Sequence, residues 1–297
     1  MARSFPPDVV VLDHDSLTHA RFGRGKANPR LLQAKTLRLP AETFAPGAVT
    51  PQLAGEGALA EALRRLRHET GRWDKVSMLL PDAWFRMNIV DLPSLPDRNG
   101  EALEVVRWSL KRTLPIPPEQ MRVAYTVLSR GSGGARVLVV SALDATLAAI
   151  ERLFAAAGLD IVLIEPLGLS IWNAIAVREG VTNADRLFIY LRDTDFTTAV
   201  FRGEQPLFIR SRNLSADRTI EQEIRLSASY LRESLGVDSF DACWIAGDGA
   251  AAIEATLTDE FQSPVRALVL RDYAEEIPSG IANHEAELIA CTGVFTG

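Results

Sequence analysis

Short apolar runs separated by polar turns recur along the chain in a repeated order. In residues 187–212, an apolar run ends at Leu191, a polar turn follows at 192–195, and two strand-like runs flank another turn at 203–206. β-Branched and aromatic residues between Gly, Pro and Asp clusters predict strands joined as hairpins. Residues 9–25 carry the same pattern around a turn at 13–16. Placing Asp15 on Asp193 aligns the two hairpins and predicts two related halves, although two unrelated hairpins would also match over so short a stretch.

The elements after the first hairpin complete one α/β unit and begin another. A strand at 35–39, a helix with Leu59, Leu63 and Leu66 on one face, and an apolar strand at 75–80 follow in order. Residues 85–165 then alternate in the order β-α-β-β-α-β, which is that of a ferredoxin-like unit. Its helices are predicted at 101–113 and, with Asp144 as the N-cap, at 144–157.

The second half is predicted to repeat the first without the extra unit. A helix at 167–178 leads back to the second hairpin. A long amphipathic helix at 219–235 begins with a capping box of Thr219 and Gln222 and ends at Gly236. A strand at 242–246, a helix from 250, a strand at 265–270 and a helix at 285–295 complete the chain. The predicted parts are a first lobe (1–82 and 166–182), an inserted unit (83–165) and a second lobe (183–297, with 214–240 as a small helical subdomain).

The composition narrows the range of partners. The chain has 297 residues, of which 47% are hydrophobic, and a net charge of −6. This charge argues against a nucleic acid or an anionic membrane surface as the main partner. No apolar run approaches the ~18 residues that a membrane span needs. We therefore expect that the protein does not insert directly into a membrane. It would be cytosolic, or it would be held at a membrane by another protein. Cys243 and Cys291 lie in apolar sequence and are expected to be buried free thiols.

Four stretches together resemble one known family. They are the N-terminal hairpin; residues 105–125, where a helix ends in a Leu-Pro-Ile-Pro turn; residues 137–175, which contain Glu165 and Pro166; and residues 196–213 with the helix that follows. Two β-β-β-α units, the first interrupted by an α/β unit, resemble the actin/Hsp70/sugar-kinase superfamily. Within it the chain is similar to the PilM family of type IV pilus assembly proteins, and more distantly to the cytoplasmic domain of the type II secretion protein GspL.

The resemblance implies an α/β, actin-like (ribonuclease H-like) fold of two lobes with an inserted ferredoxin-like subdomain. It also implies a protein on the cytosolic side of the inner membrane, without its own membrane span. Such a protein would hold the cytoplasmic tail of a PilN-like inner-membrane protein and link it to pilus or secretion motor components. Many members of the family bind ATP between the lobes without appreciable hydrolysis.

The nucleotide site implied by the superfamily is only partly present in this sequence. Two acidic, glycine-containing turns and a later glycine loop would surround the phosphates, because backbone N–H groups must approach closely. Neither turn here contains glycine, and Arg192 could either pair with a phosphate or fill its place. We therefore expect a degenerate site without catalysis and no resident cofactor, with ATP and Mg²⁺ as the ligands to test. The residues assigned to this site are Asp13, Asp15, Ser16, Asp193, Thr194, Gly247 and Gly249.

Other interpretations remain open at this stage. Aspartates in turns are common for turn formation alone. The same fold could serve as an ATP-binding switch or a weak ATPase or kinase, and the chain could be the soluble portion of a GspL-like protein. No Gly-x-Ser-x-Gly elbow and no Cys/His metal spacing occurs. Trp73, Trp84 and Trp108 flank or lie in the inserted unit, where core packing is the usual role but one could line a peptide groove.

Overall fold

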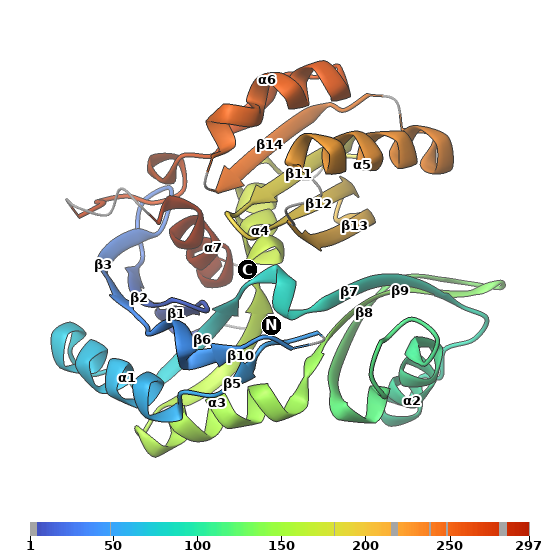
Figure 1. Cartoon of the computed structure of the whole chain (residues 1–297). Helices are drawn as coiled ribbons and strands as arrows, with labels where there is room; N and C mark the ends of the chain where they lie inside the picture. The colour runs from blue at the N-terminus through green and yellow to red at the C-terminus, as the bar shows by residue number, and fades with distance from the viewer. Residues whose placement is uncertain are drawn as a thin grey trace.

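Two five-stranded sheets form the framework of the protein (Figure 1). The computed structural model describes residues 5–47, 49–180, 182–214, 219–237, 239–247, 249–278 and 284–296. The first sheet has the order β10-β6-β1-β2-β3 and the second the order β13-β12-β11-β14-β15. The strands of the first lobe are β1 (Asp8–Leu12), β2 (Ser16–Gly23), β3 (Arg30–Arg38), β6 (Lys75–Leu80) and β10 (Asp160–Pro166). Those of the second are β11 (Asp185–Leu191), β12 (Asp195–Arg202), β13 (Gln205–Asn213), β14 (Ala242–Gly247) and β15 (Val265–Ala267).

The two sheets have the same topology, as the predicted repeat requires. In each, a three-stranded antiparallel meander is extended by two parallel strands. The predicted alignment of the hairpins is wrong by one residue. Leu12 pairs with Leu17, and Leu191 pairs with Phe196, so Arg192 takes the place of Asp13 and Thr194 that of Asp15. Successive side chains of a strand point to opposite faces, so only this register keeps matching faces buried.

Two helices lie between the sheets and form the central core (Figure 1). These are α4 (Leu167–Glu179) and α7 (Glu285–Thr296). Gly293 allows them to pack closely, because a Cβ there would lie 1.9 Å from the carbonyl oxygen of Ser170. The indole of Trp172 stacks on the ring of Phe201 with the ring centroids 3.7 Å apart. Apolar side chains of both sheets therefore share one continuous core with these helices.

The outer faces of the two sheets are covered by separate helices. Helices α1 (Glu56–Thr70) and α3 (Asp144–Ala156) pack on the first sheet, and α5 (Ile220–Leu235) and α6 (Ala250–Phe261) on the second. Thr219 and Gln222 form the predicted capping box of α5, and Gly236 ends this helix in the left-handed conformation. The strand predicted at 265–270 is shorter, since β15 ends at Ala267 and a 3₁₀ turn follows at Leu270. None of the helices in the described ranges combines the length and apolar character needed to cross a bilayer.

The inserted unit is smaller than predicted. Its sheet contains β7 (Arg86–Leu92), β9 (Gly134–Leu143) and β8 (Met121–Gly131), in that order, and α2 (Asn99–Leu110) packs on it. The chain order β-α-β-β-α-β is present, but its last helix and strand, α3 and β10, belong to the first lobe. Strand β10 pairs in parallel with β6, and Leu147, Ile150 and Phe154 of α3 pack among the leucines of α1. Burial of both apolar faces in the larger core decides this placement.

The inserted unit also contacts the second lobe. Strand β13 lies beside β7, and the Gln205 side chain donates a hydrogen bond to the Leu128 carbonyl (2.7 Å). Of the predicted small helical subdomain, residues 215–218 and 238 lie outside the described ranges, and α5 shares the core of the second sheet. The remaining short elements are η1 (Ala41–Thr43), β4 (Phe44–Ala45), β5 (Gln52–Leu53), η2 (Asp82–Trp84), η3 (Pro118–Gln120) and η4 (Leu270–Asp272).

Candidate functional site

The two polar turns meet between the lobes. One turn follows β1 and the other follows β11, and each is closed by an equivalent backbone hydrogen bond. The Asp13 N–H donates to the Ser16 carbonyl (2.9 Å), and the Arg192 N–H donates to the Asp195 carbonyl (2.8 Å). The guanidinium of Arg192 forms an ion pair with Asp13 of the other lobe and lies 3.3 Å from Asp195 Oδ2. Because Arg192 and Asp13 hold equivalent places in the repeat, the contact joins a residue of one lobe to its counterpart in the other.

This ion pair is largely removed from solvent. The side chains of Arg192 and Asp13 are 9% and 11% exposed. Burial alone would raise the pKa of Asp13, but the hydrogen bond from His14 and the charge of Arg192 outweigh it and lower the pKa to about 2. Burial would also lower the pKa of Arg192, yet the nearby carboxylates raise it above its usual range. Both groups are therefore charged at neutral pH.

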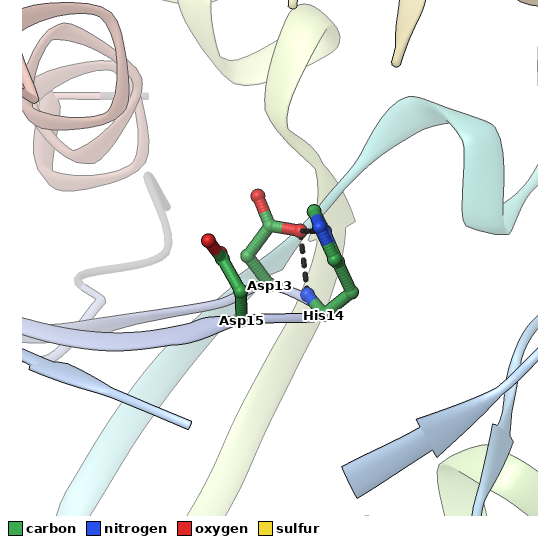
Figure 2. A group of neighbouring side chains, drawn as sticks. All are labelled: Asp13, His14 and Asp15. Atoms are coloured by element: carbon green, nitrogen blue, oxygen red, sulfur yellow. Dashed lines mark hydrogen bonds and ion pairs between the residues drawn. The ribbon is translucent and has the colours of Figure 1, made fainter. Parts of the chain in front are cut away.

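Figure 2 shows how His14 and Asp15 lie around Asp13. The His14 ring Nδ1 is 2.6 Å from Asp13 Oδ1, and this contact is the main cause of the raised pKa of His14. The ligand atoms of Asp13, His14 and Asp15 all lie within 4.8 Å of one another, a spacing that could suit a metal ion. However, Oδ1 of Asp13 is engaged by His14 and Oδ2 by Arg192. A Mg²⁺ ion prefers six oxygen ligands, so this arrangement does not fit it.

A cavity of about 580 Å³ opens beside the two turns. Both basic and acidic side chains line it, and no apolar side chain lines its described part. Its shape could therefore admit a polar ligand, but any anionic group would meet carboxylates as well as cations. The lining residues are Asp13, His14, Asp15, Ser16, Thr36, Arg38, Arg192, Asp193, Thr194, His284 and Glu287.

A second carboxyl group, Asp82, lies deeper between the lobes and is fully buried. Its Oδ1 accepts the N–H of Gly168 (2.8 Å) and thereby caps the first turn of α4, whose N-cap residue is Pro166. Burial raises the pKa of Asp82 to about 6, against the opposing effects of Gly168 and the Thr197 hydroxyl. A Cβ at Gly168 would lie 2.2 Å from Asp82 Oδ2, so only glycine permits this approach.

The structure brings together five of the seven predicted site residues. Asp13, Asp15, Ser16, Asp193 and Thr194 all line the cavity. The other two, Gly247 and Gly249, are not among its described lining residues.

Packing accounts for the first of these glycines. Gly247 has φ of +102°, and a Cβ there would lie 1.8 Å from the Leu191 carbonyl oxygen. Gly249, also in the left-handed region, is the N-cap of α6, and Asp248 between them lies outside the described residues.

Sequence reasoning gave no site role to Asp82, and it named Asp195 only with Asp13, Asp15 and Asp193 as turn aspartates consistent with metal binding. Asp82 and Asp195 are both buried, and burial raises the pKa of each. A signal for Asp82 was available, because only Pro81 separates it from the end of the apolar strand β6. Residues after the carboxyl ends of neighbouring parallel strands meet at one edge of a sheet. Asp195 has the sequence of an ordinary turn residue, and only its pairing with Arg192 distinguishes it.

Comparison with solved structures confirms the predicted fold. A solved PilM–PilN complex of type IV pilus biogenesis superimposes with a TM-score of 0.82 and 18% identity, covering 99% of this chain and 98% of that one. A Bacteroides thetaiotaomicron protein with an actin-like ATPase fold gives a TM-score of 0.58 at 12% identity, covering 98% and 95%. The cytoplasmic domain of EpsL, an inner-membrane component of the Vibrio cholerae type II secretion system, gives 0.54 at 13%, covering 98% and 94%. The chain therefore has the actin-like ATPase fold.

Comparison by sequence adds nothing to this result. No protein-family model and no curated protein matches the chain. The fold similarity thus rests on the arrangement of the elements and not on shared residues.

Proposed function

We propose that this protein is an actin-like scaffold of a type IV pilus or related secretion assembly machine. In this role it binds the cytoplasmic tail of a PilN-like inner-membrane protein and couples that protein to motor components. It would act in the cytoplasm, held at the inner membrane by its partner. The observation that carries the proposal is the similarity to a PilM–PilN complex over almost the full length of both chains. Such coverage includes the inserted unit as well as the two lobes.

The arrangement of the two turns supports a scaffold without nucleotide turnover. Phosphate-binding loops present backbone N–H groups and small residues to the ligand. Here the side chain of Arg192 lies between the turns and is neutralised by Asp13 and Asp195. A bound triphosphate would have to displace this ion pair and place its charges beside Asp15 and Asp193. We therefore expect a degenerate site, no hydrolysis and no resident Mg²⁺.

The inserted unit offers a surface for an extended partner tail. Trp108 on α2 is 71% exposed, whereas the other four tryptophans are buried. Large exposed aromatic side chains are frequent anchors of protein interfaces. Strand β8 is also an edge of the three-stranded sheet, and an extended peptide can add to such an edge through backbone hydrogen bonds. Both features suit a short tail that enters without its own fold.

The test is a titration of the protein with a synthetic N-terminal tail of a PilN-like protein. Since Trp108 is the one tryptophan open to solvent, acrylamide quenching of the intrinsic fluorescence reports mainly on it. Binding should protect the indole of the parent protein. Anisotropy of a fluorescently labelled peptide measures the variants, and Trp108→Ala should weaken binding about tenfold or more, as expected for an anchor residue. Tyr230→Ala is the matched control, because Tyr230 is an exposed aromatic residue of the second lobe. Absence of binding at about 0.5 mM peptide would mean a binding free energy weaker than about −4.5 kcal/mol, and it would contradict the proposal.

The second candidate function is an ATP-binding switch of the same fold. The cavity beside the turns favours it, because His14, Arg38 and Arg192 could contact phosphate groups there. A ligand that binds only the folded protein stabilises it by about 2.7 kcal/mol at 100 times its dissociation constant. Thermal unfolding with increasing Mg-ATP separates the two functions: a scaffold with a degenerate site shows no shift, and a switch shows a rise that grows with concentration.

A further inference from the structure

A second contact joins the lobes at the end of the first sheet away from the acidic turns. There the loop between β2 and β3 meets the segment that follows η4. The carboxylate of Glu275 accepts three successive backbone N–H groups, from Lys26 (3.2 Å), Ala27 (2.9 Å) and Asn28 (3.1 Å). Successive N–H groups that converge in this way form an anion-binding nest. The nest is thus filled by a carboxylate from the same chain, and its N–H groups lower the pKa of Glu275.

Gly25 makes the loop compact enough for this contact. A Cβ at this position would lie 1.8 Å from the Asn28 carbonyl oxygen and 2.7 Å from Glu275 Oε2. Both distances are far below contact distance, so a side chain at Gly25 would distort the nest and push the carboxylate away. The sequence therefore supports this contact from two separate positions, one in each lobe.

Backbone bonds extend the contact along the edge strand β3. The Glu275 N–H donates to the Pro29 carbonyl (2.8 Å), and the Leu31 N–H donates to the Glu275 carbonyl (2.9 Å). The Asn28 side chain also donates to the Asp272 carbonyl (3.2 Å). Segment 272–276 therefore adds to the start of β3 as a short strand would, in addition to filling the nest.

We propose that Glu275 in its nest is a latch that holds the two lobes in one fixed orientation together with the Arg192–Asp13 pair. The hairpin β1–β2 places the acidic turn at one end of the first sheet and the loop after β2 at the other. Strand β2 has eight residues, so the two attachments lie roughly 25 Å apart. Two attachments at such a separation oppose rotation of one lobe relative to the other. A partner then binds to a rigid platform and does not drive the opening of a hinge.

The latch is tested by pulsed electron–electron distance measurements on the full chain. Spin labels at Arg65→Cys on α1 and Thr258→Cys on α6 report the separation of the lobes, since both positions are exposed and the native cysteines are buried. The otherwise unchanged protein should give one narrow distance distribution. Glu275→Ala should broaden it about twofold or more by freeing a rigid-body motion.

Two further variants make the result specific. Gly25→Ala should broaden the distribution in the same way, although it leaves every charge in place. Glu104→Gln is the matched control, because Glu104 is an exposed acid whose ion pair, with Arg107, lies within α2 and takes no part in the contact between the lobes. If Glu275→Ala and Gly25→Ala fold normally by circular dichroism and keep the narrow distribution, the latch is refuted. Equal broadening by Glu104→Gln would refute it as well. Neither outcome depends on whether a PilN-like tail binds.

Discussion

Replacing Arg192 by alanine should be among the most destabilising single changes in this protein. Its guanidinium is the cation that pairs with Asp13 and Asp195 between the lobes, and its side chain is only 9% exposed. Removing one partner of a buried ion pair leaves the other charge unpaired and costs about 3–5 kcal/mol. The substitution Arg192→Ala leaves the carboxylates of Asp13 and Asp195 close together without a cation. We therefore expect the unfolding free energy to fall by an amount in that range.

The pKa of Asp13 gives an independent estimate for the other partner. Its decrease from the usual 3.8 to about 2 corresponds to about 2.5 kcal/mol of folding free energy. Because the pKa is lowered in the folded state, this stabilisation is present above pH 3.8 and lost as the pH falls through about 2. Asp13→Asn should therefore cost about 2–3 kcal/mol at neutral pH and much less near pH 2.

The assay is urea unfolding at neutral pH, followed by circular dichroism, for both single variants and the double variant. Since the residues are in direct contact, the two effects should not add, and the double variant should lose at least ~1 kcal/mol less than the sum. Arg202→Ala is the control, because this exposed arginine pairs with Asp185 at the surface, where solvent screens the charges, and should change the stability little. A loss below about 1 kcal/mol for Arg192→Ala, or additivity within about 0.5 kcal/mol, would show that the ion pair does not hold the lobes together.

Three further changes test other parts of the fold. Between about pH 4.5 and 7.5, the unfolding free energy of Asp82→Asn should rise by about 2 kcal/mol relative to that of the parent protein. The reason is that the pKa of Asp82 is raised in the folded protein, so the stability of the parent declines as the pH rises through about 6. Urea unfolding of both proteins at the two pH values measures this, and the same difference at both would contradict it. Gly247→Ala should lower the unfolding free energy by more than about 1 kcal/mol in urea, since its Cβ would meet the Leu191 carbonyl, and a neutral effect would place the clash in doubt. Thr219→Ala should cost about 1 kcal/mol by removing the capping box of α5, whereas Thr219→Ser should retain most of it.

The sequence by itself determined the local elements and their order. The capping box at Thr219, the end of α5 at Gly236 and the alternating strands of both hairpins depend on residues a few positions apart, and each is found in the structure. The repeated order of these elements, together with the resemblance to a known family, was enough to predict the actin-like fold. It was also enough to bring Asp13 and Asp193 to the same cavity.

Only the tertiary structure decided which residues meet across long distances in the chain. Strand β10 joins the first sheet because burial beside β6 outweighs its position next to the inserted unit in the sequence. The register of the second hairpin differs by one residue from the predicted alignment, so Arg192, and not an aspartate, lies opposite Asp13. Glu275 binds a nest formed by a loop that lies 248 residues earlier in the sequence. No local pattern contains such pairings, because the partners lie far apart in the sequence and meet only in the folded protein.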